Sequence, residues 1–231
     1  MSSLIAERIS EIRQHLPAPV RLIAVTKQVS VAAMREAYTA GVRDFGESRI
    51  QEADSKQSQM QDLSDITWHF IGRLQSNKAK KALEQFQWIH SLDSLKLAQR
   101  LNQLAEPLSH KPFVCLQVKI KSDPNKSGWT VPELLADLAQ LNQCSHLQIQ
   151  GLMTIPPLGL DKSEIIEVFD STRELADKIQ QQNWPHIQMQ QLSMGMSDDY
   201  QLAIPAGATM VRLGRILFGE RTNSSSSSIT T

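Results

Sequence analysis

The stretch RLIAVTKQVSVAAMREAYTAGVRDFGE (residues 21–47) contains one complete unit of strand, helix and strand. Its first part, 21–26, is rich in apolar and β-branched residues, which is typical of a buried strand. Ser30 can cap a helix that ends before Gly41, and glycine is the preferred residue just past a helix end. The segment 42–47 then predicts a second strand. A helix between two strands indicates a crossover connection, and therefore parallel pairing.

The same alternation continues along the chain. Six further runs have strand character, at 67–72, 88–92, 113–120, 147–154, 187–193 and 209–214. Helical patterns separate them, including one that Asp93 is predicted to cap and one that opens with Thr130 and Glu133, close to a capping box. An amphipathic pattern at 3–15 precedes the first strand and predicts an additional N-terminal helix.

Eight strands that alternate with helices are what a (β/α)8 barrel of the TIM type requires, and 231 residues suit one small barrel. An open doubly wound sheet is the alternative, but nothing in the sequence resembles the GxGxxG turn of that fold. The sequence therefore predicts an α/β protein with a single barrel domain over residues 1–221 and an extra N-terminal helix. The serine-rich segment 222–231 is predicted to be a disordered tail.

The composition excludes several classes of function. The 24 basic residues balance the 24 acidic residues, so no field of one sign is available to hold nucleic acid or an anionic membrane. No apolar run reaches the length of a membrane span, and the N-terminus lacks the apolar core of a signal peptide. Cys115 and Cys144 are isolated, which favours reduced packing residues over a disulfide or a metal site. These features predict a soluble, cytoplasmic protein.

Polar side chains follow several predicted strands, at the ends where barrels carry their functional sites. Lys27 follows the first strand and shares a face with Ile23 and Val25, and Arg212 shares a face with Met210 on the last strand. If these faces line the barrel, an amine and a guanidinium meet at its mouth. Two cations there require an anionic or electron-rich ligand.

Phosphate is an anion that barrels frequently bind with the loops after their last two strands. Ser193 offers a hydroxyl there, and Gly214 lets the backbone approach, so that the amides of Gly214 and Arg215 can donate to phosphate oxygens. A lysine in an apolar pocket beside other cations loses proton affinity and becomes a nucleophile toward an aldehyde. Lys27, Arg212 and a phosphate cradle together predict pyridoxal 5′-phosphate, bound as a Schiff base on Lys27. Arg212 would donate to an unprotonated pyridine nitrogen and leave the ring a weak electron sink.

Each of these residues also has a purely structural interpretation. Taken alone, Lys27 is more often an exposed lysine at a strand end, and Arg212 a salt-bridge residue at the rim. His69 and His90 lie in strand patterns and are interpreted as core or wall histidines, because no ligand spacing joins them to a metal. The functional interpretation is favoured because several independent signals fall on one predicted rim.

The chain resembles the pyridoxal phosphate homeostasis proteins (the YggS/PROSC-like group), which are similar to the N-terminal barrel domain of alanine racemases. The stretches that carry the resemblance are LIAVTK, FGESRIQEA, WHFIGRLQSNK, NKSGW, GLMTI, LSMGMSDDY and VRLGRILFG. The resemblance implies a (β/α)8-type barrel, with Lys27 as the Schiff-base lysine and Arg212 at the pyridine nitrogen. It also implies that Ser193, Gly214 and Arg215 hold the phosphate.

Two positions depart from the family pattern. The family usually has asparagine where this chain has Ser48 and Lys119. A serine is shorter and offers less to the ring face of the cofactor, and Lys119 would add a positive charge near the mouth if it points inward.

The resemblance also implies a role. It points to a non-catalytic protein of intracellular vitamin B6 homeostasis and of amino-acid and keto-acid balance, a monomer, with apo forms of pyridoxal phosphate enzymes as candidate partners. One alternative is a pyridoxal phosphate-dependent amino-acid racemase, and another is an aldolase in which Lys27 attacks the substrate directly. Members of the family lack the second domain that supplies the racemase's catalytic tyrosine across a dimer, and we expect the same here, which favours a non-catalytic role.

Overall fold

Eight parallel strands close into a barrel in the computed structural model, which describes residues 3–220. They are β1 (Arg21–Val25), β2 (Asp44–Glu47), β3 (Thr67–Phe70), β4 (Trp88–Leu92), β5 (Phe113–Lys119), β7 (Gln148–Met153), β8 (Ile187–Ser193) and β9 (Met210–Leu213). Neighbours follow the order β4-β3-β2-β1-β9-β8-β7-β5, and pairing of β4 with β5 closes the ring. The predicted (β/α)8 barrel is confirmed. The predicted tail at 222–231 lies outside the described residues.

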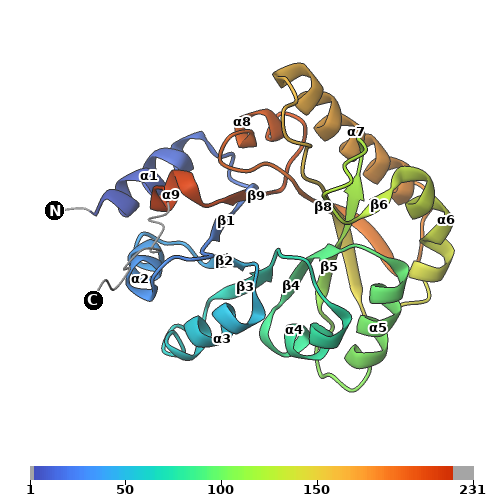
Figure 1. Ribbon diagram of the computed structural model, residues 1–231, viewed down its shortest axis with the longest axis horizontal. Coiled ribbons are helices and arrows are strands. Elements are labelled where there is room, and N and C mark those ends of the chain that lie inside the picture. The colour runs from blue at the N-terminus through green and yellow to red at the C-terminus, as the bar shows by residue number, and fades with distance from the viewer. Residues whose placement is uncertain (1–2, 221–231) are drawn as a thin grey trace, which may run out of the picture.

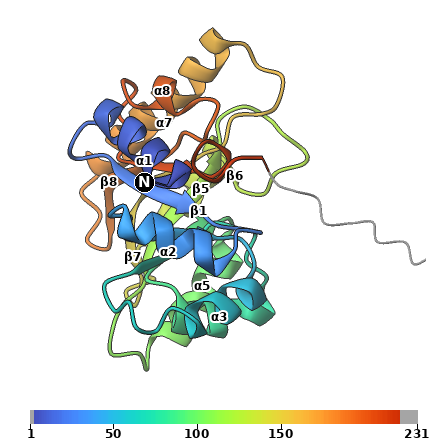
Figure 2. The same ribbon diagram turned by 90° about the vertical axis from the view of Figure 1, so that its left-hand side faces the viewer.

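Helices surround the strands (Figure 1). They are α1 (Leu4–His15), α2 (Val31–Thr39), α3 (Ile50–Ser58), α4 (Ala79–Gln85), α5 (Leu95–Ala105), α6 (Val131–Leu141), α7 (Lys162–Gln180), α8 (Tyr200–Ala203) and α9 (Arg215–Phe218). The extra N-terminal helix is confirmed as α1, which packs on α2 and α9 and lies on the same side of the barrel as α2 in Figure 2. Within residues 3–220, none of the helices combines the length and the apolar character needed to cross a bilayer.

Most of the predicted capping residues lie at the helix ends where the sequence indicates them. The Ser30 hydroxyl accepts from the amide of Ala33, and Gly41 follows α2 with a left-handed φ of 92°. Thr130 and Glu133 form the capping box of α6. The prediction of Asp93 as a cap is wrong by one residue.

Ser94 caps α5 instead, since its backbone is extended and its hydroxyl accepts from the amide of Leu97. A 3-10 turn over Ser76–Lys78 leads into α4, and the two-residue strand β6 (Trp129–Thr130), which has no counterpart in the prediction, pairs with β5 outside the barrel ring.

The strands separate two apolar clusters. Residues such as Leu22 and Ala24 of β1 belong to the large outer core between the strands and the helices. A small inner cluster fills part of the barrel interior, with Ile23, Trp88, Cys115, Met153 and Met210. Other buried side chains are polar, among them His69, His90, Ser193 and Arg212. Buried polar groups require hydrogen-bond partners, and the partners of these four side chains define the interior beneath the functional site.

Candidate functional site

A cavity of about 460 Å³ lies at the carboxyl ends of the barrel strands. Residues that follow β1, β2, β3, β7 and β8 line it, together with the end of β9. Of the residues singled out in the sequence, Lys27, Arg212, Gly214 and Arg215 all line this cavity. The barrel therefore brings together side chains from the first and the last strand, as the face pattern predicts.

Lys27 lies in the turn after β1 and is half-buried. The residue before it, Thr26, is wholly buried, and its amide donates to the carbonyl of Gly46 at 2.9 Å. The residue after it, Gln28, has a φ of 62°, in the left-handed region that residues other than glycine seldom adopt. An unusual backbone conformation persists only where the surroundings enforce it.

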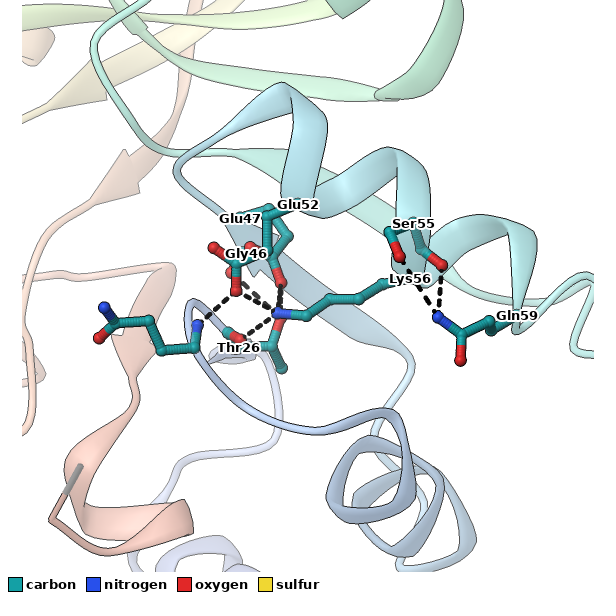
Figure 3. Close-up of polar contacts among 8 residues, drawn as sticks. Thr26, Gly46, Glu47, Glu52, Ser55, Lys56 and Gln59 are labelled. Atoms are coloured by element: carbon teal, nitrogen blue, oxygen red, sulfur yellow. Dashed lines mark hydrogen bonds and ion pairs between the residues drawn. The ribbon is translucent and has the colours of Figure 1, made fainter. Parts of the chain in front are cut away.

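A buried cluster of charges enforces this turn (Figure 3). Nζ of Lys56 donates to the carbonyl oxygen of Thr26 at 2.5 Å, to Oε1 of Glu47 at 2.7 Å and to Oε1 of Glu52 at 2.6 Å. The Thr26 hydroxyl donates to Oε1 of Glu47 at 2.6 Å, and the amide of Gln28 donates to the Glu52 carboxylate. Both neighbours of the site lysine are thus tied to the cluster, and we call Glu47, Glu52 and Lys56 the lysine-turn clamp.

The two carboxylates of the clamp respond differently to their surroundings. Burial raises the pKa of Glu47, although hydrogen bonds from Lys56 and Thr26 oppose the shift. Oε2 of Glu47 is buried and has no hydrogen-bond partner within residues 3–220. Burial also acts to raise the pKa of Glu52, but hydrogen bonds from Lys56 and the Gln28 amide outweigh it, and that pKa is lowered.

Arg212 supplies the buried cation of the cavity. Its Nη1 donates to the Ser193 hydroxyl at 2.6 Å, and its Nη2 donates to the carbonyl of Thr154 at 3.0 Å. Burial lowers the pKa of Arg212 to about 10, although the negative charge of Asp199 opposes the shift. The guanidinium therefore stays charged at neutral pH, held by two neutral oxygens.

Ser193 lies beneath Arg212 and does not line the cavity. It is wholly buried, and its hydroxyl lies between Nη1 of Arg212 and Nδ1 of His90, which is 2.7 Å away. Besides Ser48, the cavity lining includes a second serine, Ser197, which the strand pattern did not predict as a site residue. Its hydroxyl lies 3.4 Å from the amides of both Gly214 and Ile216.

A turn in SMGMS separates the two serines. Gly195 has a φ of 92°, and a Cβ there would lie 2.8 Å from Cβ of Ala203 and 2.9 Å from Cα of Tyr200. Gly195 is the feature of the sequence that could have indicated this difference between the two serines, because a left-handed turn redirects the residues that follow a strand. Ser193 therefore ends β8 in the barrel interior, whereas Ser197 lines the cavity.

The cavity wall near β9 contains a backbone segment that packs tightly on β1 and an arginine that forms an ion pair. A Cβ on Gly214 would lie 3.3 Å from the carbonyl oxygen of Val25, so this backbone packs tightly on β1. The exposed guanidinium of Arg215 binds both oxygens of the Asp198 carboxylate, and this hydrogen bond raises the pKa of Arg215. Arg215 and Asp198 both line the cavity, so this ion pair is part of its wall.

The two positions that depart from the family pattern lie in different places. Ser48 lines the cavity. Lys119 ends β5, where its backbone pairs with Thr130, and it is not part of the cavity lining in the described structure. In residues 3–220, no group of three or more His, Cys, Asp or Glu side chains is arranged to hold a metal ion.

The family model described as "Alanine racemase, N-terminal domain" matches residues 2–222. The pyridoxal phosphate homeostasis protein of Synechocystis sp. is 53% identical over 212 residues, which covers 92% of this chain and 96% of that protein. The protein of the same name from Pseudomonas aeruginosa is 43% identical over 221 residues, with 94% and 93% covered.

Solved structures show the same relationship. PipY of Synechococcus elongatus, solved with PLP bound, has a TM-score of 0.89 and 51% identity, covering 93% of this chain and 100% of that chain. An alanine racemase of Clostridium difficile has a TM-score of 0.77 at 16% identity, covering 95% of this chain and 57% of that chain, which shows a shared fold alone.

Proposed function

This chain belongs to the family of the alanine racemase N-terminal domain and, within it, to the pyridoxal phosphate homeostasis proteins, and from that membership we propose that it binds pyridoxal 5′-phosphate as a non-catalytic protein of vitamin B6 homeostasis. The observation that carries the proposal is the meeting of Lys27 and Arg212 at one cavity. The cavity volume of about 460 Å³ suits a ligand of this size. PipY, 51% identical to this chain, was solved with PLP bound.

The residues present fit the chemistry of this cofactor. When bound, pyridoxal phosphate supplies an aldehyde that can condense with a lysine amine. We assign the covalent Schiff-base link to Nζ of Lys27 and the contact with the pyridine nitrogen to Arg212. We assign the phosphate to the backbone amides of Gly214 and Arg215, with the hydroxyl of Ser197 beside them. In this arrangement Ser193 acts by holding Arg212.

The proposal of a non-catalytic role rests on the lining of the cavity. Racemisation requires an acid or base on each face of the substrate carbon. Tyr38 donates to Asp65 at the surface and Tyr200 is buried in α8, and neither is a lining residue of the described cavity. The lining therefore supports binding without turnover, while a racemase-like enzyme remains the second candidate because of the shared barrel.

The proposal also covers the oligomeric state, the compartment and the partners of the protein. We propose a monomer in the cytoplasm that exchanges its cofactor with apo forms of pyridoxal phosphate enzymes. The unbridged, buried thiols of Cys115 and Cys144 suit a reducing compartment. Burial raises the pKa of Cys115 to about 12, so this thiol is protonated and unreactive.

Borohydride reduction of the loaded protein tests the covalent assignment. We expect the mass of one reduced cofactor on the peptide that contains Lys27, and loss of the near-visible absorbance in Lys27→Ala. The matched control Lys119→Ala removes a lysine that lies outside the cavity lining, and should keep both signals. Labelling of a different lysine in wild-type protein would overturn the assignment.

A further inference from the structure

A continuous line of hydrogen bonds crosses the barrel interior from Arg212 to Asp44. Nη1 of Arg212 lies 2.6 Å from Oγ of Ser193, which lies 2.7 Å from Nδ1 of His90. Nε2 of His90 lies 2.9 Å from Nδ1 of His69, and Nε2 of His69 lies 2.8 Å from Oδ1 of Asp44. The five side chains come from β9, β8, β4, β3 and β2, so only the closed barrel assembles them.

The line joins the two ends of the barrel. Arg212 lines the cavity at the carboxyl ends of the strands. Ser193, His90 and His69 are wholly buried. Asp44 is the first residue of β2 and lines a separate cavity at the amino ends, where Arg21 lies 3.7 Å from its carboxylate. A charge at the far end is therefore linked to the guanidinium at the mouth through three uncharged groups.

The chemistry of the groups sets the direction of every hydrogen bond. A carboxylate only accepts, so Nε2 of His69 must carry a hydrogen. In a neutral ring Nδ1 of His69 then accepts, which requires a hydrogen on Nε2 of His90. Nδ1 of His90 in turn accepts from the Ser193 hydroxyl, and the Ser193 oxygen is left to accept from Arg212. All four bonds thus donate toward Asp44.

The surroundings keep both rings neutral. Burial lowers the pKa of His69, although the Asp44 carboxylate opposes this shift. Burial, which is the largest cause, and the positive charges of Arg212 and Arg21 lower the pKa of His90 well below its ordinary value. Three other groups face the line: the indole of Trp88, which stacks on His69, the protonated thiol of Cys115, and the carboxylate of Asp199, which acts on Arg212.

We propose that Asp44, His69, His90 and Ser193 are positioning residues that act through Arg212. The Asp44 carboxylate polarises the line, keeps the Ser193 oxygen turned toward Arg212 as an acceptor, and so sets the guanidinium against the ring nitrogen of the cofactor. The part that concerns the cofactor rests on the proposed function. The order Asp–His–Ser also occurs in hydrolases, but here the serine is wholly buried beneath Arg212 and no substrate reaches it.

Nuclear magnetic resonance of the histidine rings tests the direction in cofactor-free protein. We expect His69 and His90 to carry hydrogen on Nε2 and none on Nδ1, and to stay neutral at pH 7. Exposed His110 serves as the internal comparison in the same spectra. A hydrogen on Nδ1 of either buried ring, or a charged ring at pH 7, would overturn the proposal.

A double-mutant cycle tests the action through Arg212. Asp44→Asn keeps an oxygen that can accept from His69 but removes the charge at the end of the line. We expect affinity for pyridoxal phosphate to fall roughly three- to ten-fold in the wild-type background, and by less than about two-fold in an Arg212→Gln background. The loss should persist with pyridoxine 5′-phosphate, which has no aldehyde for Lys27 to bind.

The control Asp137→Asn makes the same chemical change at a carboxylate that accepts from the indole of Trp129, away from the line, and should leave affinity unchanged. Urea midpoints check that each variant folds. Equal loss in both backgrounds would mean that Asp44 does not act through Arg212. If wild-type protein does not bind pyridoxal phosphate at all, the proposed function fails, while the ring spectra still decide the direction of the line.

Discussion

Nζ of Lys56 lies 2.5 Å from the carbonyl oxygen of Thr26, the residue that precedes Lys27. The same ammonium binds Glu47 and Glu52, which hold the other groups of the turn. A buried lysine of α3 therefore holds the backbone that presents the site lysine. The clamp links the stability of the protein to the geometry of the turn that carries Lys27 at the cavity.

Lys56→Met should destabilise the protein strongly. The methionine has a similar volume, but it leaves two carboxylates and a carbonyl without their shared donor. Removal of one member of a buried ion pair costs about 3–5 kcal/mol of unfolding free energy. Urea denaturation measures this loss. The control Lys81→Met removes an exposed ion pair with Asp54 and should cost about 1 kcal/mol or less. Similar losses in the two variants would show that the clamp is not a special source of stability.

Gly214→Val should weaken binding of pyridoxal phosphate more than binding of pyridoxal. The new side chain would press on the backbone of Val25 and move the amides assigned to the phosphate. Loss of one charge-assisted hydrogen bond costs about 1.5–3 kcal/mol, so affinity for the phosphorylated form should fall about ten-fold or more. Titration with both vitamers measures the difference. Ser197→Ala should have a smaller effect of the same kind, and equal losses for the two vitamers would place the phosphate elsewhere.

Stability should fall as the pH drops below about 6.5, the ordinary value of a histidine. The pKa values of His69 and His90 are lowered in the folded protein, so the unfolded chain binds protons first as the pH falls. Their contribution is complete above the unfolded pKa and is lost below it, at up to about 1.4 kcal/mol per pH unit for each ring.

Urea unfolding between pH 8 and pH 5 measures this slope in cofactor-free protein. His69→Gln and His90→Gln should each reduce the slope, and the exposed control His110→Gln should keep it. Carboxylates such as Glu47, whose pKa is raised in the folded protein, change the unfolding free energy with pH in the opposite direction. Their contribution is the same in wild type and variants, so it cancels when the slopes of the two are compared. An unchanged slope in both buried variants would contradict the assignment of neutral rings.

The loaded protein should not racemise amino acids. Lys27 can serve one face of a substrate carbon, but no tyrosine or histidine is among the described residues that line the cavity. We expect no accumulation of D-alanine from L-alanine, and ready reloading of the apo-protein with free cofactor. Chiral chromatography measures the first, and absorbance the second. Sustained turnover that Lys27→Ala abolishes would establish the racemase alternative.

The sequence by itself determined the barrel and the residues at its strand ends. Strand and helix periods are local properties, as are the cap at Ser30 and the glycine after α2, so they can be counted along the chain. Alternation of faces along a strand was also enough to direct Lys27 and Arg212 to the same cavity.

Only the tertiary structure decided which polar side chains meet. His90 and Ser193 are 103 residues apart in the chain, yet 2.7 Å separates their side chains once the barrel closes. The left-handed turn at Gly195 separates Ser193, which is buried at the end of β8, from Ser197, which lines the cavity. The turn packs against Tyr200 and Ala203 of α8, so its geometry depends on the position of that helix. Hydrogen bonds between strands and helices distant in sequence leave no periodic signal in the sequence, because their geometry exists only after the backbone has folded.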